Sequence, residues 1–332
     1  MADQDITKDV SKPLKTWSHL ARNRRRPTEY EIVSTNMLWS TDEPAPWAQG
    51  PDIPMTKWYV KYRNDSPLRH DNWNEFRDPD QLVYRTYTML QDRHETFVDG
   101  LLDDYNKNDH DLTLSEEWVS TLARFYTPLR YLLHSVQMSA AYLVSMSPGS
   151  TIENCFMFES ADQLRWVSRV AYRTAELAAS HPGSGFGQNE RDIWENDPAW
   201  QGFREMMERV LIAWDWGEQF VALNLVAKPA IDELLKTLGR MARQNQDNLL
   251  ALLVDAELVD SARTQRFTTA LVHYAREHGD NIRVLKDWAN KWRPYADAAL
   301  DAYVSALSQD LAREATMHAI RDAAAFRAGL GL

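Results

Sequence analysis

The sequence predicts an all-α fold: a bundle of long helices that follows an extended N-terminal arm. The 332 residues include only 12 glycines beside abundant Leu, Ala, Glu and Arg, which favours helices over many short strands. The stretch Leu211–Leu235 is apolar at steps of three or four residues, as the central helix of a bundle would be. The first 78 residues hold half of the chain's 14 prolines, so long helices cannot run through them.

Residues 1–78 are interpreted as this arm. It carries Trp17, Trp39, Trp47, Trp58 and Trp73, whereas disordered tails are usually poor in large rings that need burial. The rings could fold back on the chain's own helices, but a groove on another subunit is the favoured interpretation. A basic run within the arm is either a solvated patch or an ionic contact to a partner: Arg22, Arg24, Arg25 and Arg26.

Residues 79–310 are predicted to form the helical domain, and residues 311–332 a C-terminal helix or tail. Asp78-Pro79 and Asp197-Pro198 resemble helix starts, and Ser160 begins an apparent capping box. Pro128 and Pro229 are expected to kink or divide two helices. The expected helices span 79–106, 115–147, 160–180, 198–227, 229–245, 261–278, 281–292, 294–308 and 311–327.

The helix expected over Leu211–Leu235 is apolar on nearly all sides and should be buried. Its polar exceptions are Asp215, Glu218 and Asn224. Carboxylates on a buried bundle helix either mark a metal site or occupy the ends of the helix. On the helix expected over 160–180, Arg165, Arg169 and Arg173 share one side, which is predicted to face solvent or a partner.

A di-iron carboxylate bundle needs Glu-x-x-His pairs, because a spacing of three places both side chains on one face. None of the nine histidines has a Glu three residues before it, and Val221 stands three residues after Glu218. The helical frame is therefore present and this ligand set is absent. The sequence also lacks a Gly-rich phosphate loop after a strand, a cysteine pair for zinc and a G-x-S-x-G elbow.

The net charge and the cysteine content limit the possible binding partners and the cellular location of the protein. A formal charge of -11 opposes binding to nucleic acid or to an anionic membrane surface. The longest uncharged run, 131–152, contains His134, Gln137 and Pro148, so a buried bundle helix is a better interpretation than a membrane span. The single cysteine, Cys155, is expected to be a buried small residue, and a cytoplasmic location is predicted.

Four segments resemble the small, or beta, hydroxylase subunit of soluble bacterial multicomponent di-iron monooxygenases, with toluene and toluene/o-xylene monooxygenases as the most similar members. They are KTWSHLARNRRRPTEYEIVS (15–34), SPLRHDNWNEFRDPDQLVYRTY (66–87), ADQLRWVSRVAYRT (161–174) and WENDPAWQGFREMMERVLIAWDWGEQFVALNLVAKP (194–229). The resemblance implies a ferritin-like, ribonucleotide-reductase-like bundle without metal ligands. It carries no catalytic, cofactor-binding or metal-binding residue over to this chain.

The resemblance also implies a hydroxylase built as a dimer of alpha-beta-gamma units, with the di-iron centre in the alpha subunit. Electrons from NADH would arrive through a reductase and a Rieske ferredoxin, and a small effector protein would regulate the alpha subunit. A structural subunit of an aromatic hydrocarbon monooxygenase is thus the leading hypothesis. Alkene and isoprene monooxygenases, a self-contained all-carboxylate di-iron protein that uses Glu218, and a helical scaffold outside any oxygenase are the alternatives. The residues expected to contact the alpha subunit are Trp17, His19, Leu20, Arg24, Pro27 and Tyr30.

Overall fold

The computed structural model describes residues 26–35, 50–307 and 312–332, and these residues contain helices and turns but no strand. The all-α prediction is confirmed. The elements are α2 (Glu29–Ser34), α3 (Pro54–Tyr59), η2 (Val60–Asn64), η3 (Trp73–Glu75), α4 (Tyr84–Lys107), η4 (His110–Thr113), α5 (Glu116–Thr121), η5 (Leu122–Tyr126), α6 (Leu129–Met146), α7 (Ser150–Ser180), α8 (Glu190–Asn196), α9 (Pro198–Val210), α10 (Trp216–Phe220), η6 (Val221–Ala227), α11 (Lys228–Gln244), α12 (Asn248–Ala275), α13 (Asn281–Leu307) and α14 (Ala312–Gly329).

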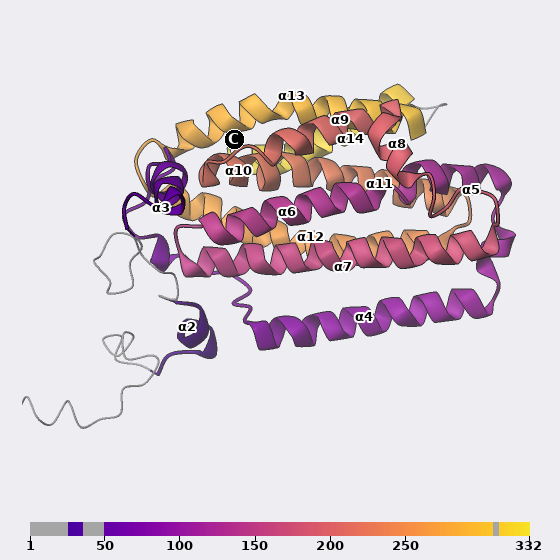
Figure 1. Ribbon diagram of the computed structural model, residues 1–332, viewed down its shortest axis with the longest axis horizontal. Coiled ribbons are helices and arrows are strands. Elements are labelled where there is room, and N and C mark those ends of the chain that lie inside the picture. Colours follow the sequence, from indigo (N-terminus) through magenta and orange to yellow (C-terminus); the bar gives the residue numbers. More distant parts are fainter. Residues whose placement is uncertain (1–25, 36–49, 308–311) are drawn as a thin grey trace, which may run out of the picture.

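The long helices run roughly along one direction (Figure 1). Helix α6 packs beside α7, α9 beside α13, and α11 beside α12, while α14 covers α11 and α13. Helix α4 lies along the outside of this bundle, beyond α7 (Figure 1). Packing of neighbouring helices buries one continuous apolar core that runs from Leu68 to Leu330.

The central segment is buried as predicted, but it is not one helix from residue 211. Helix α9 ends at Val210, and a new helix starts only after Asp215. The Asp215 carboxylate accepts hydrogen bonds from the backbone N–H groups of Gly217 and Glu218, at 2.9 and 3.1 Å, and so caps α10. Every residue from 219 to 235 is buried. The prediction missed the break because apolar periodicity continues across the turn.

Pro229 marks a change of helix type rather than a break. Because proline has no N–H, the carbonyl of Leu225 loses its usual helical donor. The backbone adopts a π-helix over η6, and the buried guanidinium of Arg327 donates to the Leu225 carbonyl at 3.2 Å. The last helix, α14, thereby stabilises the bundle centre.

Several predicted helix starts were wrong. Helix α4 starts at Tyr84, because the Asp78 carboxylate accepts from the N–H groups of Asp80 and Leu82 and caps a turn instead. Helix α7 starts ten residues before the apparent capping box, and Ser160 accepts a hydrogen bond from the Gln137 amide within the helix pair. Helix α12 starts at Asn248 rather than near 261. The Asp247 carboxylate caps its N-terminus by accepting a hydrogen bond from the Leu250 N–H.

Two other helices also differ from the predicted ones. The predicted helix over 115–147 is divided into α5, η5 and α6, with Pro128 directly before α6, so the expected break at Pro128 is confirmed. The two helices predicted on either side of Pro294 form one helix, α13, with the proline inside it. Packing against α9 and α14 offsets the missing helical hydrogen bond at Pro294.

The tryptophans in the described part of the N-terminal region pack on the chain's own helices. The Trp58 indole donates to the Tyr142 hydroxyl at 2.9 Å, and the rings of Trp73 and Trp216 meet edge to face at 5.0 Å. Residues 54–78 therefore follow the alternative in which aromatic residues fold back on the bundle. No helix in the described ranges is both long enough and apolar enough to cross a membrane.

Candidate functional site

A cluster of charged and polar side chains lies in the middle of the bundle, where α7, η6, α11 and α12 meet. Glu159, Asn224, Lys228, Asp232 and Glu257 are each less than 5% exposed. The Lys228 ammonium lies 3.4 Å from the Asp232 carboxylate, one helical turn along α11. Charged groups this deeply buried need compensating partners, because burial removes their hydration.

Helix α12 supplies partners for Asp232. The Ser261 hydroxyl and the Gln265 amide donate to its two carboxylate oxygens, the latter at 2.9 Å. The Asn224 amide donates to Glu159 at 2.9 Å and to the Thr268 hydroxyl at 3.3 Å. Asn224, the one polar residue between Phe220 and Ala227, therefore connects α7 to α12.

The cluster shifts the ionisation of its members. Burial lowers the pKa of Lys228, but Asp232, Glu257 and Glu159 together raise it above its usual value. Burial raises the pKa of Glu257 to about 8, and the Lys228 charge opposes this only in part. Burial likewise raises the pKa of Glu159 to about 7, against the Asn224 hydrogen bond and Lys228. One fixed ammonium therefore faces carboxyl groups that hold protons near neutral pH.

A second buried cluster joins α4, α7 and α12. Arg263 of α12 pairs with Asp162 of α7, and Arg165 of α7 pairs with Asp260 of α12. From α4, the Gln91 amide donates to Asp162 at 2.7 Å and to Asp260 at 2.9 Å. The cross-pairing gives each of these buried carboxylates an arginine from the neighbouring helix.

Further donors complete the second cluster. The Tyr87 hydroxyl donates to Asp162 and the Trp166 indole to Asp260, both at 2.9 Å. Burial would raise the pKa of Asp260, but its contacts with His94 and Arg165 leave that pKa below its usual value. Asp260 is therefore an ionised carboxylate held by fixed donors.

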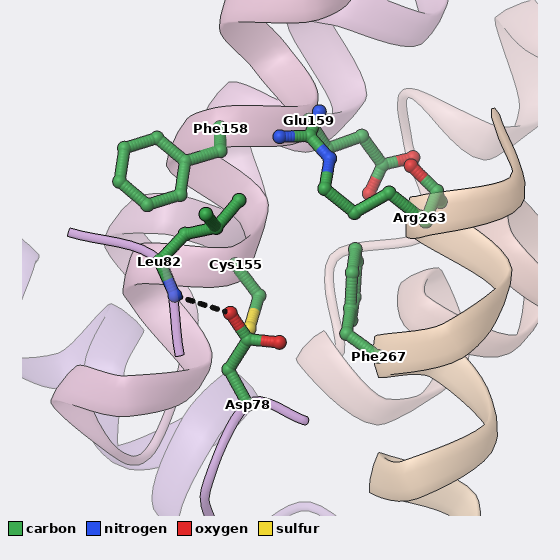
Figure 2. Close-up of a pocket in the computed structure, with 8 residues that line it drawn as sticks. Asp78, Leu82, Cys155, Phe158, Glu159, Arg263 and Phe267 are labelled. Atoms are coloured by element: carbon green, nitrogen blue, oxygen red, sulfur yellow. Dashed lines mark hydrogen bonds between the residues drawn. The ribbon is translucent and has the colours of Figure 1, made fainter. Parts of the chain in front are cut away.

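A small void adjoins these clusters. It is lined by Asp78, Leu82, Cys155, Phe158, Glu159, Arg263, Thr264 and Phe267 (Figure 2) and has a volume of about 10 Å³. Such a volume holds at most a single water molecule, so it cannot admit a substrate. Cys155 lies on its wall with its thiol directed at the Thr151 carbonyl, and burial raises the pKa of that thiol well above its usual value. Cys155 is the buried small residue that was predicted, not a nucleophile.

These residues do not fit a di-iron centre. In such a centre the metal ions neutralise the carboxylates, whereas here Lys228, Arg165 and Arg263 pair with Asp232, Asp260 and Asp162. Within the described ranges, no three His, Cys, Asp or Glu side chains converge as metal ligands would. Glu218 lies near the surface, where it accepts from Lys291 at 2.5 Å and from the Trp292 indole at 3.0 Å. The arrangement neutralises charge and joins helices.

The arginine stripe on α7 was predicted to face solvent or a partner, and this was wrong. Arg165 and Arg169 both pair with Glu95 of α4, and Arg169 also pairs with Asp99 at 2.6 Å. Arg173 pairs with Asp111 of η4 and is only 2% exposed. The stripe is largely buried because α4 and η4 cover it with matching carboxylates, which single-helix periodicity cannot indicate.

Of the residues predicted to contact the alpha subunit, Trp17, His19, Leu20 and Arg24 lie outside the described residues. Pro27 is partly exposed just before α2. Tyr30 is 3% exposed, and its hydroxyl accepts a hydrogen bond from the Asp78 N–H at 2.9 Å. The Tyr30 side chain is thus packed against its own chain.

Sequence reasoning missed Lys228, Asp232 and Glu257 as members of one cluster. A signal was available, because Lys228 and Asp232 stand one turn apart, directly after the apolar stretch that ends at Ala227. Glu257, Asp260 and Thr264 likewise share one side of α12 at steps of three and four. Which helix faces which could not be inferred from these spacings.

The sequence pattern of the methane/phenol/alkene hydroxylase family matches residues 58–279. The chain is 52% identical to the beta subunit of the toluene-4-monooxygenase hydroxylase component of Ectopseudomonas mendocina, over 91% of this chain and 93% of that subunit. It is 23% identical to the small subunit of the propane 2-monooxygenase hydroxylase component of Gordonia sp. strain TY-5, over 89% and 82% of the two chains.

The fold also matches a chain in a solved structure of toluene 4-monooxygenase with toluene in the resting active site. The TM-score is 0.86 at 52% identity, and the match covers 90% of this chain and 98% of that chain. The family match spans most of the chain, and the full-length relatives it resembles are beta or small subunits. The chain therefore belongs to the methane/phenol/alkene hydroxylase family, as a beta, or small, hydroxylase subunit.

Proposed function

We propose that this chain is the structural subunit of a hydroxylase that inserts one oxygen atom of O2 into an aromatic hydrocarbon of the toluene, xylene or benzene class. The chain itself carries out no chemistry in this proposal. The observation that supports it most is the bundle centre, where Lys228, Arg165 and Arg263 neutralise the buried carboxylates. The substrate class rests on the 52% identity to the toluene-4-monooxygenase beta subunit.

The proposed assembly is a dimer of heterotrimers in the cytoplasm. A larger alpha subunit would hold the di-iron centre, and a gamma subunit would complete each half. Electrons from NADH would reach the alpha subunit through a flavin iron-sulfur reductase and a Rieske ferredoxin, with a small effector protein as regulator. In this arrangement the beta subunit needs only a stable fold and surfaces that fit its partners.

The N-terminal region is the first proposed contact with the alpha subunit. Deletion of residues 1–25 removes Trp17, His19, Leu20 and Arg24 but leaves α2 and the Tyr30 contact with Asp78 in place. We expect the truncated chain to unfold at the same temperature as the full chain and to copurify with the alpha subunit in at least tenfold lower yield. An unchanged yield would remove this part of the proposal.

The function itself is tested by coexpressing this chain with the large and gamma subunits of a hydroxylase, followed by turnover with NADH, reductase, ferredoxin and effector protein. We expect a stable complex that oxidises toluene and a complex lacking this chain that is unstable or inactive. A chain that purifies alone and leaves turnover unchanged when omitted would contradict the proposal.

An alkene or isoprene monooxygenase is the second candidate, supported by the family description, which names alkene hydroxylases beside methane and phenol hydroxylases. The same complex, supplied in turn with toluene, propene and isoprene, separates the two. Faster turnover of toluene at saturating substrate supports the aromatic proposal, and faster turnover of an alkene replaces it with the second candidate.

A further inference from the structure

The void shown in Figure 2 lies where the two buried clusters meet. Glu159 of α7, a member of the first cluster, lines it, and so does Arg263 of α12, a member of the second. The turn before α4 closes the void with Asp78 and Leu82. Each of the three chain segments around the void therefore contributes one ionisable side chain to its lining.

Two of these side chains have hydrogen-bonding capacity that the surrounding protein does not use. Glu159 is 1% exposed; its Oε2 atom accepts from the Asn224 amide, whereas Oε1 has no partner among the described residues. Arg263 is 6% exposed and pairs with Asp162 through Nη2, but Nη1 has no acceptor within the described ranges. Unpaired polar groups this deeply buried destabilise a fold, so such groups are normally hydrogen-bonded to protein or to ordered water.

Glu159 and Arg263 do not satisfy each other directly. Within the described part of the chain, the ion pairs of Arg263 are with Asp162 and, at 3.9 Å, with Asp260. Burial raises the pKa of Glu159, and the Arg263 charge is among the groups that oppose this rise, so the two side chains are close neighbours. One molecule placed between them would give each side chain its missing hydrogen-bond partner.

The size and lining of the void select the bridging molecule. Its volume of about 10 Å³ is the space that one buried water needs, and it excludes anything larger. The Arg263 charge disfavours an additional cation, and the Glu159 and Asp78 carboxyl groups disfavour an anion. Water suits this lining, because it accepts from a guanidinium and donates to a carboxylate, and it can equally accept from a protonated Glu159. Voids that stay empty are apolar, unlike this one.

Asp78 offers a third hydrogen bond. Its two carboxylate oxygens accept from the N–H groups of Asp80 and Leu82, and each oxygen can accept one more hydrogen bond. The carboxylate lies near the Cys155 thiol, on the side of the void opposite Glu159 (Figure 2). Three hydrogen bonds are the typical number for a buried water molecule.

We propose that this void holds one ordered water molecule, which accepts a hydrogen bond from Arg263 and donates to Glu159 and Asp78. The water joins the two buried clusters into one hydrogen-bonded network that extends from α4 to α11. It also connects that network to the turn before α4, through Asp78. The water site is a feature of this chain's own fold and is independent of the proposed function.

A crystal structure of the full chain, at a resolution that shows ordered waters, tests the proposal directly. We expect one peak of electron density in the void, within hydrogen-bond distance of Glu159 Oε1 and Arg263 Nη1. Glu159→Gln keeps one oxygen and gains an N–H donor, so the water should remain in that variant. Glu159→Met has a similar length but no carboxyl or amide group, so the peak should be lost.

Three crystallographic results would overturn the proposal. The first is a void without density in the wild-type chain, and the second is a direct contact between Arg263 and Glu159. The third is a peak that persists unchanged in Glu159→Met, which would show that Glu159 does not hold the water. If Glu159→Met does not fold, the wild-type and Glu159→Gln structures still decide, since both must contain the water.

Cys155 provides a second measurement in solution, because it lines the void and is the single cysteine of the sequence. Its S–H stretching band is therefore resolved in the infrared spectrum and can be followed after transfer to D2O. Water in the void gives the thiol an exchange partner, so S–H should convert to S–D at least about tenfold faster than the neighbouring N–H groups of α7 exchange. A thiol that exchanges as slowly as those N–H groups would indicate a dry void and overturn the proposal.

Discussion

Helix α4 and the η6–α11 segment join the same bundle by different means. The η6–α11 segment is buried from residue 221 to residue 235 and packs there mainly against apolar neighbours, with Lys228 and Asp232 as charged exceptions. Helix α4 reaches α7 and α12 mainly through polar side chains such as Gln91, Glu95 and Asp99. Close packing fixes the first region, whereas paired charges position the second, so the two should respond differently to mutation, pH and salt.

The largest effect is expected from Lys228→Met, which removes the ammonium and leaves Asp232 buried without its cation. Loss of one partner of a buried ion pair costs about 3–5 kcal/mol, so urea unfolding at pH 8 should show a decrease of that size. Lys236→Met on the same helix removes a half-exposed partner of Glu233 and should cost less than about 1 kcal/mol. Equal losses would mean that Lys228 does not neutralise the cluster.

The second effect concerns pH. Glu257 has a pKa of about 8 in the folded chain, above its ordinary value of 4.5, so the folded state binds the extra proton between these values. The stability from this group is present below about pH 4.5 and is lost as pH rises through about 8. Glu257→Gln should flatten the fall in unfolding free energy between pH 5 and pH 8 by more than about 1 kcal/mol. The exposed control Glu205→Gln should leave the slope unchanged, and an unchanged slope in both would contradict the assignment.

The third effect compares a glycine in a close-packed helix contact, between α9 and α13, with a glycine on α4. A Cβ atom on Gly202 of α9 would lie 2.6 Å from the Ala299 Cα of α13, so Gly202→Ala should cost about 1–3 kcal/mol. Gly100 of α4 has nothing within 4 Å of that position, and Gly100→Ala should add up to about 1 kcal/mol of helix stability. Thermal unfolding of both variants checks the opposite signs.

The smallest effect is expected at the α4–α7 ion pairs. Arg169→Ala removes the contacts to Glu95 and Asp99 and should cost about 1 kcal/mol, less in 1 M salt because exposed charges are screened. Hydrogen exchange should then speed up in α4 and stay unchanged in α11. Arg204→Ala, which removes a pair within α9, is the control. Faster exchange throughout the bundle would contradict a separate attachment of α4.

Local sequence patterns predicted which segments are helical, but not how the helices pack against one another. Apolar spacing was sufficient to predict the burial of residues 219–235, since it reports one helix at a time. The same spacing could not indicate that Asp215 starts a new helix, because a capping carboxylate and a ligand carboxylate look alike in sequence. The π-helix before Pro229 depends on Arg327, about a hundred residues away, and no local pattern contains that contact.

The buried clusters were hard to predict for the same reason. Glu159, Lys228 and Glu257 come from three helices. Whether they form one cluster depends on which faces of those helices pack together. Arg165 and Arg169 looked like a solvated stripe because the carboxylates that cover them belong to α4. The family resemblance supplied the fold and the role of the chain, while the internal neutralisation by Lys228 and the arginines required the structure.

The central claim is that this chain neutralises its buried carboxyl groups with its own cations and with bound protons, and leaves the iron to its partner. The most direct test is the iron content of the separately purified chain, expressed with excess iron, beside that of the large subunit. The account predicts less than about 0.1 iron per chain here, because a filled cation position leaves no room for a second cation, and a di-iron centre in the large subunit. Two tightly bound irons in this chain would contradict the claim.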